Sequence, residues 1–131
     1  MPDSGSEGNR GMATDWSEDI VISDLADEPA FSEDLSSIIE RMGPGSKHVP
    51  HVVLNMTDVT YLNSSNLAQL LKLRKALAER GRLLKLCSVA DEVVSLFAIT
   101  GLDKVFRFAP DPMTALAGIQ IESEANGGRP A

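Results

Sequence analysis

The chain has 131 residues, enough for one domain with a substantial core. Its hydrophobic share of 43% and charged share of 24% are those of an ordinary globular protein. A net charge of −7 argues against direct binding to nucleic acid. No apolar run approaches the roughly 20 residues of a transmembrane helix, so we expect no membrane insertion.

The first residues lack the basic and apolar segments of a secretory signal. The single cysteine, Cys87, excludes an internal disulfide bond and lies in an apolar run, where a buried thiol is expected. Both features fit a cytoplasmic protein. From the composition we expect a disordered acidic leader over 1–14, one folded domain over 15–122 and a flexible tail over 123–131.

The first half of the domain is predicted as strand, helix and strand. Ile20–Ile22 indicates a short strand bounded by acidic residues. Ser32 is in position to cap a helix that runs to about Met42, with apolar residues on one helical face, and residues 43–45 end it. Val52–Met56 is apolar at nearly every position, as expected for a strand covered on both faces.

The second half repeats this alternation. Gly81 stands where a C′ glycine ends a helix, Ser88 and Asp91 resemble a capping box, and Pro112 fits a first helical position. A helix is predicted to begin near Ser65 or Leu67, with Leu67, Leu70, Leu71 and Leu77 on its apolar side. The elements that follow are a strand over 83–89, a helix closed by residues 100–102, a strand over 105–108 and a helix through Ile119.

Strands and helices joined by short links indicate an α/β domain. We expect a mostly parallel or mixed four-stranded sheet, with right-handed crossovers and helices packed on it.

The segment Tyr61–Asn66 joins the buried strand to the long helix and carries two serines. The first N–H groups of a helix have no partner within it, and the helix dipole favours negative charge there. A phosphate on Ser64 or Ser65 would therefore meet a favourable local field. Serines at this position are also common caps, and Ser65 is the residue we expect to cap the helix.

Three segments, in their order and spacing, resemble the STAS domain family, best known for bacterial anti-sigma factor antagonists. They are the strand and serine turn from His51 to Leu67, the strand from Gly81 to Val89, and the segment from Leu96 to Phe106. The turn Asn-Ser-Ser-Asn-Leu is similar to the family's Asp-Ser-Ser-Gly-Leu. The resemblance covers roughly residues 20–120 and implies a single STAS-like domain.

The resemblance also implies a function in partner switching. In the family, the first serine of the turn accepts phosphate from an anti-sigma factor that is also a serine kinase. The dephosphorylated antagonist binds this kinase, and a serine phosphatase restores binding after phosphorylation. Ser64 is the corresponding acceptor here, with Ser65 as the second choice. Asp27 resembles an acidic residue of the family's early loop, so the implied partner-binding residues are Asp27, Asn63, Ser64, Ser65 and Asn66.

The turn departs from the family pattern at two positions. The family's aspartate before the acceptor is Asn63, which keeps size and hydrogen bonding but removes a charge. The family's glycine after the serines is Asn66, and asparagine tolerates unusual backbone angles better than most residues. These changes leave open a STAS scaffold that is not phosphorylated, or a subunit of a larger signalling or lipid-transport complex.

A small nucleotide-binding protein on the same fold is the alternative from another functional class, since fold alone does not decide function. The turn is not Gly-x-Ser-x-Gly, and Gly43–Lys47 lacks the spacing of a phosphate-binding loop. The two histidines, His48 and His51, have no cysteine or acidic cluster beside them that would complete a metal site. We therefore expect no catalytic residues, cofactor or metal.

Overall fold

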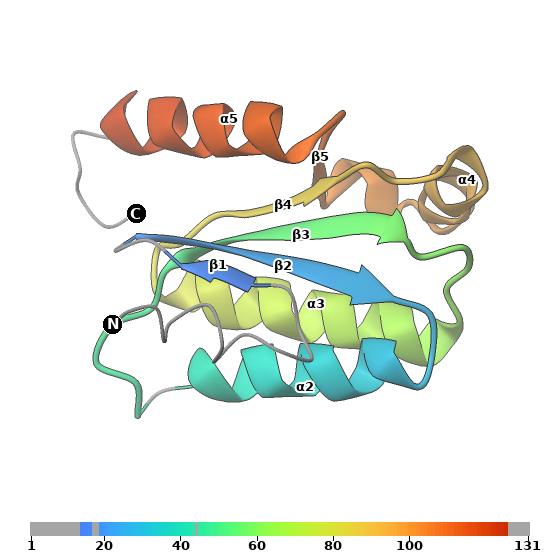
Figure 1. Cartoon of the computed structure of the whole chain (residues 1–131), viewed down its shortest axis with the longest axis horizontal. Coiled ribbons are helices and arrows are strands. Elements are labelled where there is room, and N and C mark those ends of the chain that lie inside the picture. Colours follow the sequence, from blue (N-terminus) through green and yellow to red (C-terminus); the bar gives the residue numbers. More distant parts are fainter. Residues whose placement is uncertain (1–13, 17–18, 44, 126–131) are drawn as a thin grey trace, which may run out of the picture.

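The computed structural model describes residues 14–16, 19–43 and 45–125. They form an α/β domain around one five-stranded sheet (Figure 1). The strands are β1 (Thr14–Trp16), β2 (Ile20–Ala26), β3 (His51–Asp58), β4 (Leu84–Cys87) and β5 (Arg107–Ala109). The helices are α2 (Ala30–Arg41), α3 (Ser64–Glu79), α4 (Asp91–Thr100) and α5 (Pro112–Ala125), with one turn of 3-10 helix, η1, at Leu102–Lys104.

The strands lie in chain order across the sheet. β2, β3, β4 and β5 are parallel, and Val52 of β3 pairs with Val21 on one side and Leu84 on the other. This confirms the predicted mostly parallel sheet with helices packed on it. β1 adds a fifth, antiparallel strand, with Thr14 opposite Ser23. The sequence did not predict β1 because a three-residue strand is too short for a recognisable alternation.

Helices cover both faces of the sheet. α2 and α3 lie side by side on one face, and α5 lies on the other (Figure 1). Successive side chains of a strand point to opposite faces, so Leu54 and Met56 of β3 join the core beneath α2 and α3, whereas Val53 packs with Cys87 and with Ile119 of α5. The nearly continuous apolar pattern of Val52–Met56 follows from this double covering, and Cys87 is buried as predicted.

Several helix ends agree with their sequence signals. Gly81 follows α3 with a φ of 71° and Gly101 follows α4 with a φ of 78°, a backbone conformation that favours glycine. Pro112 is the first residue of α5. This helix continues to Ala125, so the segment 123–131 expected as a tail begins inside it. Residues 126–131, and all of the expected leader except Thr14, lie outside the described residues.

Two predicted serine caps are wrong. α2 begins at Ala30, so Ser32 lies within its first turn and does not precede it. The Ser32 N–H donates to the Glu28 carboxylate. α4 begins after Ala90 without a side-chain cap, and the Ser88 hydroxyl instead donates to the Pro110 carbonyl oxygen at 3.4 Å. A serine hydroxyl has several backbone and side-chain partners within reach, so its position in the sequence does not decide which one it takes.

The predicted apolar side of α3 is confirmed for Leu70 and Leu77, which are buried. Leu71 is 37% exposed, and Leu73, which was not predicted, is fully buried. The helix packs against α2 and against the sheet, so its buried arc lies at an angle that sequence spacing alone did not resolve.

The predicted strand over 105–108 begins in a turn. The N–H groups of Val105 and Phe106 both donate to the Leu102 carbonyl oxygen. These bonds continue the tight coil of η1, so β5 starts only at Arg107.

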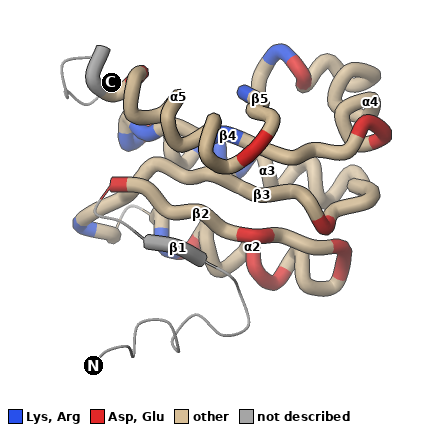
Figure 2. Tube along the Cα trace, turned by 45° about the horizontal axis from the view of Figure 1, so that its top comes forward, with Lys and Arg blue, Asp and Glu red and all other residues tan. Residues whose placement is uncertain are grey.

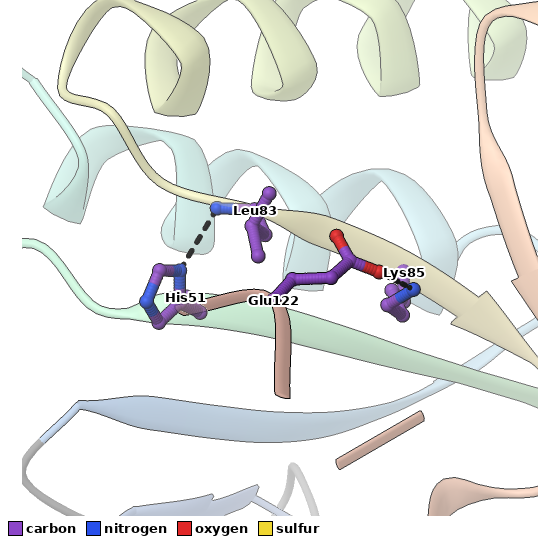
Figure 3. Close-up of polar contacts among 4 residues, drawn as sticks. All are labelled: His51, Leu83, Lys85 and Glu122. Carbon is purple, nitrogen blue, oxygen red and sulfur yellow. Dashed lines mark hydrogen bonds and ion pairs between the residues drawn. The ribbon is translucent and has the colours of Figure 1, made fainter. Parts of the chain in front are cut away.

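Beneath α5 the sheet buries two titratable side chains (Figure 3). Lys85 of β4 is 8% exposed, and its Nζ lies 2.7 Å from Oε2 of Glu122 on α5. At the start of β3, Nδ1 of His51 accepts the Leu83 N–H at 2.9 Å. Burial, reinforced by the Arg82 guanidinium, lowers the pKa of His51. A neutral His51 ring therefore links β3 to the chain entering β4.

This burial predicts that the free energy of unfolding falls as the pH drops below 6.5, the ordinary histidine pKa. The folded-state pKa of His51 is lowered, so the unfolded chain takes up the proton first, and the loss continues as the pH falls through the folded-state value. Urea denaturation from neutral pH down to about pH 5.5 measures this slope.

His51→Gln retains a hydrogen-bond acceptor without the titration and should flatten the slope. Equal slopes in the wild type and His51→Gln would contradict a role for His51.

Candidate functional site

The site lies where β2 and β3 end, at the carboxyl edge of the parallel sheet, the edge at which open α/β sheets usually bind ligands. Two loops meet there, one from β2 to α2 and one from β3 to α3 (Figure 1). The Asp27 carboxylate accepts a hydrogen bond from the Thr60 N–H at 2.8 Å and another from the Thr60 hydroxyl at 2.6 Å. The Thr60 hydroxyl and then its N–H lower the pKa of Asp27, so the carboxylate joins the loops in its ionised form.

A reciprocal capping box fixes the start of α3. Asn63 is the N-cap residue, and its Oδ1 accepts the Asn66 N–H at 2.7 Å. In return, Oδ1 of Asn66 accepts the Asn63 N–H at 3.1 Å. The prediction that Ser65 caps this helix is therefore wrong. The two asparagines satisfy each other's backbone groups and leave the serines outside the cap.

Asn66 also links α3 to the other loop. Its Nδ2 donates to Oε2 of Glu28 at 2.8 Å, and its side chain is only 1% exposed. The same Glu28 carboxylate accepts the Ser32 N–H at 2.9 Å and the Ser32 hydroxyl. Hydrogen bonds from Ser32, followed by the one from Asn66, lower the pKa of Glu28. Asn66 thus acts as an internal fastener between α3, the β2–α2 loop and α2.

The amide of Asn66 is buried and faces the interior, and its direct contact with a partner stays a prediction. Asn66 needs no tolerance of unusual backbone angles: among the described residues other than glycine, positive φ occurs only at Ser88. The residue matters for the hydrogen bonds of its side chain.

Ser64 and Ser65 occupy the first turn of α3, and both are exposed. Neither hydroxyl has a hydrogen-bond partner among the residues that the structure describes. The first turn of α3 contains no acidic residue, so nothing within it opposes an anion at the positive end of the helix. The neighbouring Tyr61 is 50% exposed. The structure therefore brings Asp27, Asn63, Ser64 and Ser65 to one edge, with Asn66 beneath them.

Among the described residues, no histidine lies beside Ser64. The chain has two histidines, and both lie at the opposite edge of the sheet, with His51 opening β3 and His48 just before it. Within the described residues, no three His, Cys, Asp or Glu side chains gather as a metal site. In the same part of the chain, no helix combines the length and hydropathy of a membrane span.

Residues 23–115 match the family model of the STAS domain. The chain belongs to the STAS domain family. The solved STAS structures that resemble it include an anti-sigma-factor antagonist domain protein from Planctomyces limnophilus, with a TM-score of 0.70 and 18% identity over 83% of this chain and 97% of that one.

A candidate anti-sigma factor antagonist from Thermotoga maritima gives a TM-score of 0.71 with 16% identity, covering 86% of this chain and 97% of that one. A serine-to-glutamate variant of RsbS from Moorella thermoacetica gives 0.67 with 12% identity, covering 87% and 98%. At these identities the likeness concerns the fold.

The sequence analysis did not predict the hydrogen bonds by which Asn63, Asn66 and Glu28 fix this turn. The Asn-x-x-Asn spacing at Asn63 and Asn66 could have indicated a capping box, because side chains three positions apart at a helix start can bond each other's backbone. Glu28 gave no such signal. It lies 38 positions from Asn66, and only the folded sheet brings the two together.

Removing the Asn66 amide tests this arrangement. Asn66→Ala leaves the Asn63 N–H without its acceptor and Glu28 without one donor, so the free energy of unfolding should fall by about 1–3 kcal/mol. The neighbouring Ser65→Ala should change it by less than about 0.5 kcal/mol, because Ser65 is exposed. Urea denaturation at neutral pH measures both, and equal effects would contradict the fastening role.

Proposed function

We propose that this STAS protein is a cytoplasmic anti-sigma factor antagonist that binds an anti-sigma factor with serine kinase activity and is regulated by phosphorylation of Ser64. The observation that carries the proposal is the Ser64 hydroxyl, exposed and without a hydrogen-bond partner among the described residues, at the N-terminus of α3. The likeness to anti-sigma factor antagonist structures supports the class of partner.

The proposed docking surface surrounds this hydroxyl. Asn63 and Ser65 flank Ser64, and Asp27 lies in the adjoining loop. Asn66 contributes from below by fixing the turn. In the unphosphorylated state a partner would therefore meet a surface whose shape is already set, which limits the conformational entropy lost on binding.

Phosphorylation would act through charge and bulk at this surface. A phosphate adds about −1.5 to −2 charges and three acceptor oxygens. None of the described hydrogen bonds of the turn uses the Ser64 hydroxyl, so modification breaks none of them. Acidic residues already gather along β2 and α2 (Figure 2), and the new charge adds to them. The partner is released because the contact becomes too negative and too crowded, and a serine phosphatase reverses the change.

A scaffold that is never phosphorylated is the second candidate. Asn63 favours it, because this residue provides the cap without the negative charge that the family pattern places beside the acceptor. The two candidates differ in one respect: only the switch requires that a charge at Ser64 alters the choice of partner.

Ser64→Asp provides the test. With wild-type and Ser64→Asp proteins as baits in native lysate, mass spectrometry should identify a serine kinase of the anti-sigma type that the wild type retains and the variant loses. Titration calorimetry with the purified kinase should then show at least about tenfold weaker binding, which corresponds to roughly 1.4 kcal/mol.

Two matched variants serve as controls. Ser64→Ala should retain the kinase, because it adds no charge. Ser65→Asp, one position along the same helix turn, should weaken binding less than Ser64→Asp. Identical partners and affinities for the wild type and Ser64→Asp would overturn the switch and favour the scaffold.

A further inference from the structure

A groove of about 370 Å³ lies between the later turns of α2 and α3, away from the Ser64 end of α3. The volume falls in the range of small-molecule sites, which often form between helices. The lining residues are Ile39, Met42, Gly43, Lys72, Lys75, Ala76, Glu79 and Arg80.

The groove has an apolar floor. Ile39 and Met42 come from α2 and its end, and Ala76 comes from α3. Met42 is 2% exposed and belongs to the main core, against which Ile39 and Ala76 pack. The small side chain of Ala76 keeps the space between the helices open. A ligand in the groove would therefore contact a floor already fixed by the core.

Positive charges surround this floor. Lys72 and Lys75 are exposed, and within the described residues neither ammonium group makes an ion pair or a hydrogen bond. Arg80 is held in place, since its guanidinium donates to the carbonyl oxygens of Gly43 at 3.1 Å and Ser46 at 2.8 Å. Glu79 is the one acidic residue among the lining residues.

The charge pattern selects the ligand. Three cations against one anion give the groove a positive local charge, although the chain carries a net charge of −7. A purely apolar ligand would leave the two lysines without partners, and a small inorganic anion would leave the floor uncovered. A ligand that satisfies both parts carries an apolar chain and one anionic group.

The length of the groove indicates the size of this ligand. From Lys72 to Arg80 the helix rises by about 12 Å, at 1.5 Å per residue. This length and the volume of about 370 Å³ match a small molecule. Both suit a single short alkyl or acyl chain.

We propose that this groove binds a small amphipathic anion, a short alkyl or acyl chain that ends in a phosphate or a carboxylate. The chain lies on Ile39, Met42 and Ala76, and the anionic group is held by Lys72 and Lys75 beside the fixed guanidinium of Arg80. The site is separate from the Ser64 turn and does not depend on the function proposed for that turn.

The test is a titration of the full-length protein with octyl phosphate and, separately, with octanoate, followed by amide chemical shifts in NMR spectra. Saturable shifts should appear around the groove residues of α2 and α3 and not at Ser64. The two probes distinguish phosphate from carboxylate, and saturation with either supports the site. Inorganic phosphate and octyl trimethylammonium should bind much more weakly, because each lacks one half of the ligand.

Variants locate the binding. Lys72→Gln combined with Lys75→Gln should weaken it by about tenfold, the effect expected from losing two partly exposed charge contacts. Lys104→Gln, which removes an exposed lysine of η1 outside the groove, should leave the affinity unchanged. Ala76→Met should block the chain by filling the groove.

Three results would overturn the proposal: no saturable shifts with either probe, equal binding of octyl trimethylammonium, or equal loss of affinity in the groove variants and Lys104→Gln. Circular dichroism of each variant confirms that it is folded. A result at this groove leaves the Ser64 test unaffected, because the two sites lie towards opposite ends of α3.

Discussion

The buried amide of Asn66 joins the parts on which the candidate site depends. Its oxygen accepts the Asn63 N–H, and its nitrogen donates to Glu28. Glu28 in turn holds the first turn of α2 through Ser32. An amide can serve both neighbours because it carries a donor and an acceptor on one rigid plane. Without it, α3 would lose half of its capping box and its direct bond to the other loop.

This arrangement bears on the proposed phosphorylation of Ser64. The backbone around Ser64 is fixed by side chains on both sides, while its own hydroxyl takes no part in the fastening. A modification of Ser64 therefore changes the surface without removing an internal bond. For the phosphorylation proposed at Ser64, this geometry favours an effect of added charge and bulk, whereas refolding of the turn would require breaking the bonds of Asn66 and the pair formed by Asp27 and Thr60.

Much of the fold could be predicted because its signals are local. The apolar run of β3, the glycine after α3 and the proline that opens α5 each reflect a constraint on nearby backbone. The serine caps failed because hydroxyls choose among several partners, and Ser65 lost this role to a pair of amides. Ser64 was predicted as the phosphate acceptor from a family resemblance, and that role stays a prediction. Glu28 was not found, because its partner Asn66 is distant in sequence and meets it only in the folded protein.

The most direct measurement is the site of phosphorylation in the protein isolated from the cells that make it, mapped by tandem mass spectrometry before and after incubation with its purified partner kinase and ATP. We expect phosphate on Ser64, with little on Ser65, and loss of the modification in Ser64→Ala. Stoichiometric phosphate on another residue, or an unmodified chain that still binds and releases the kinase, would contradict it.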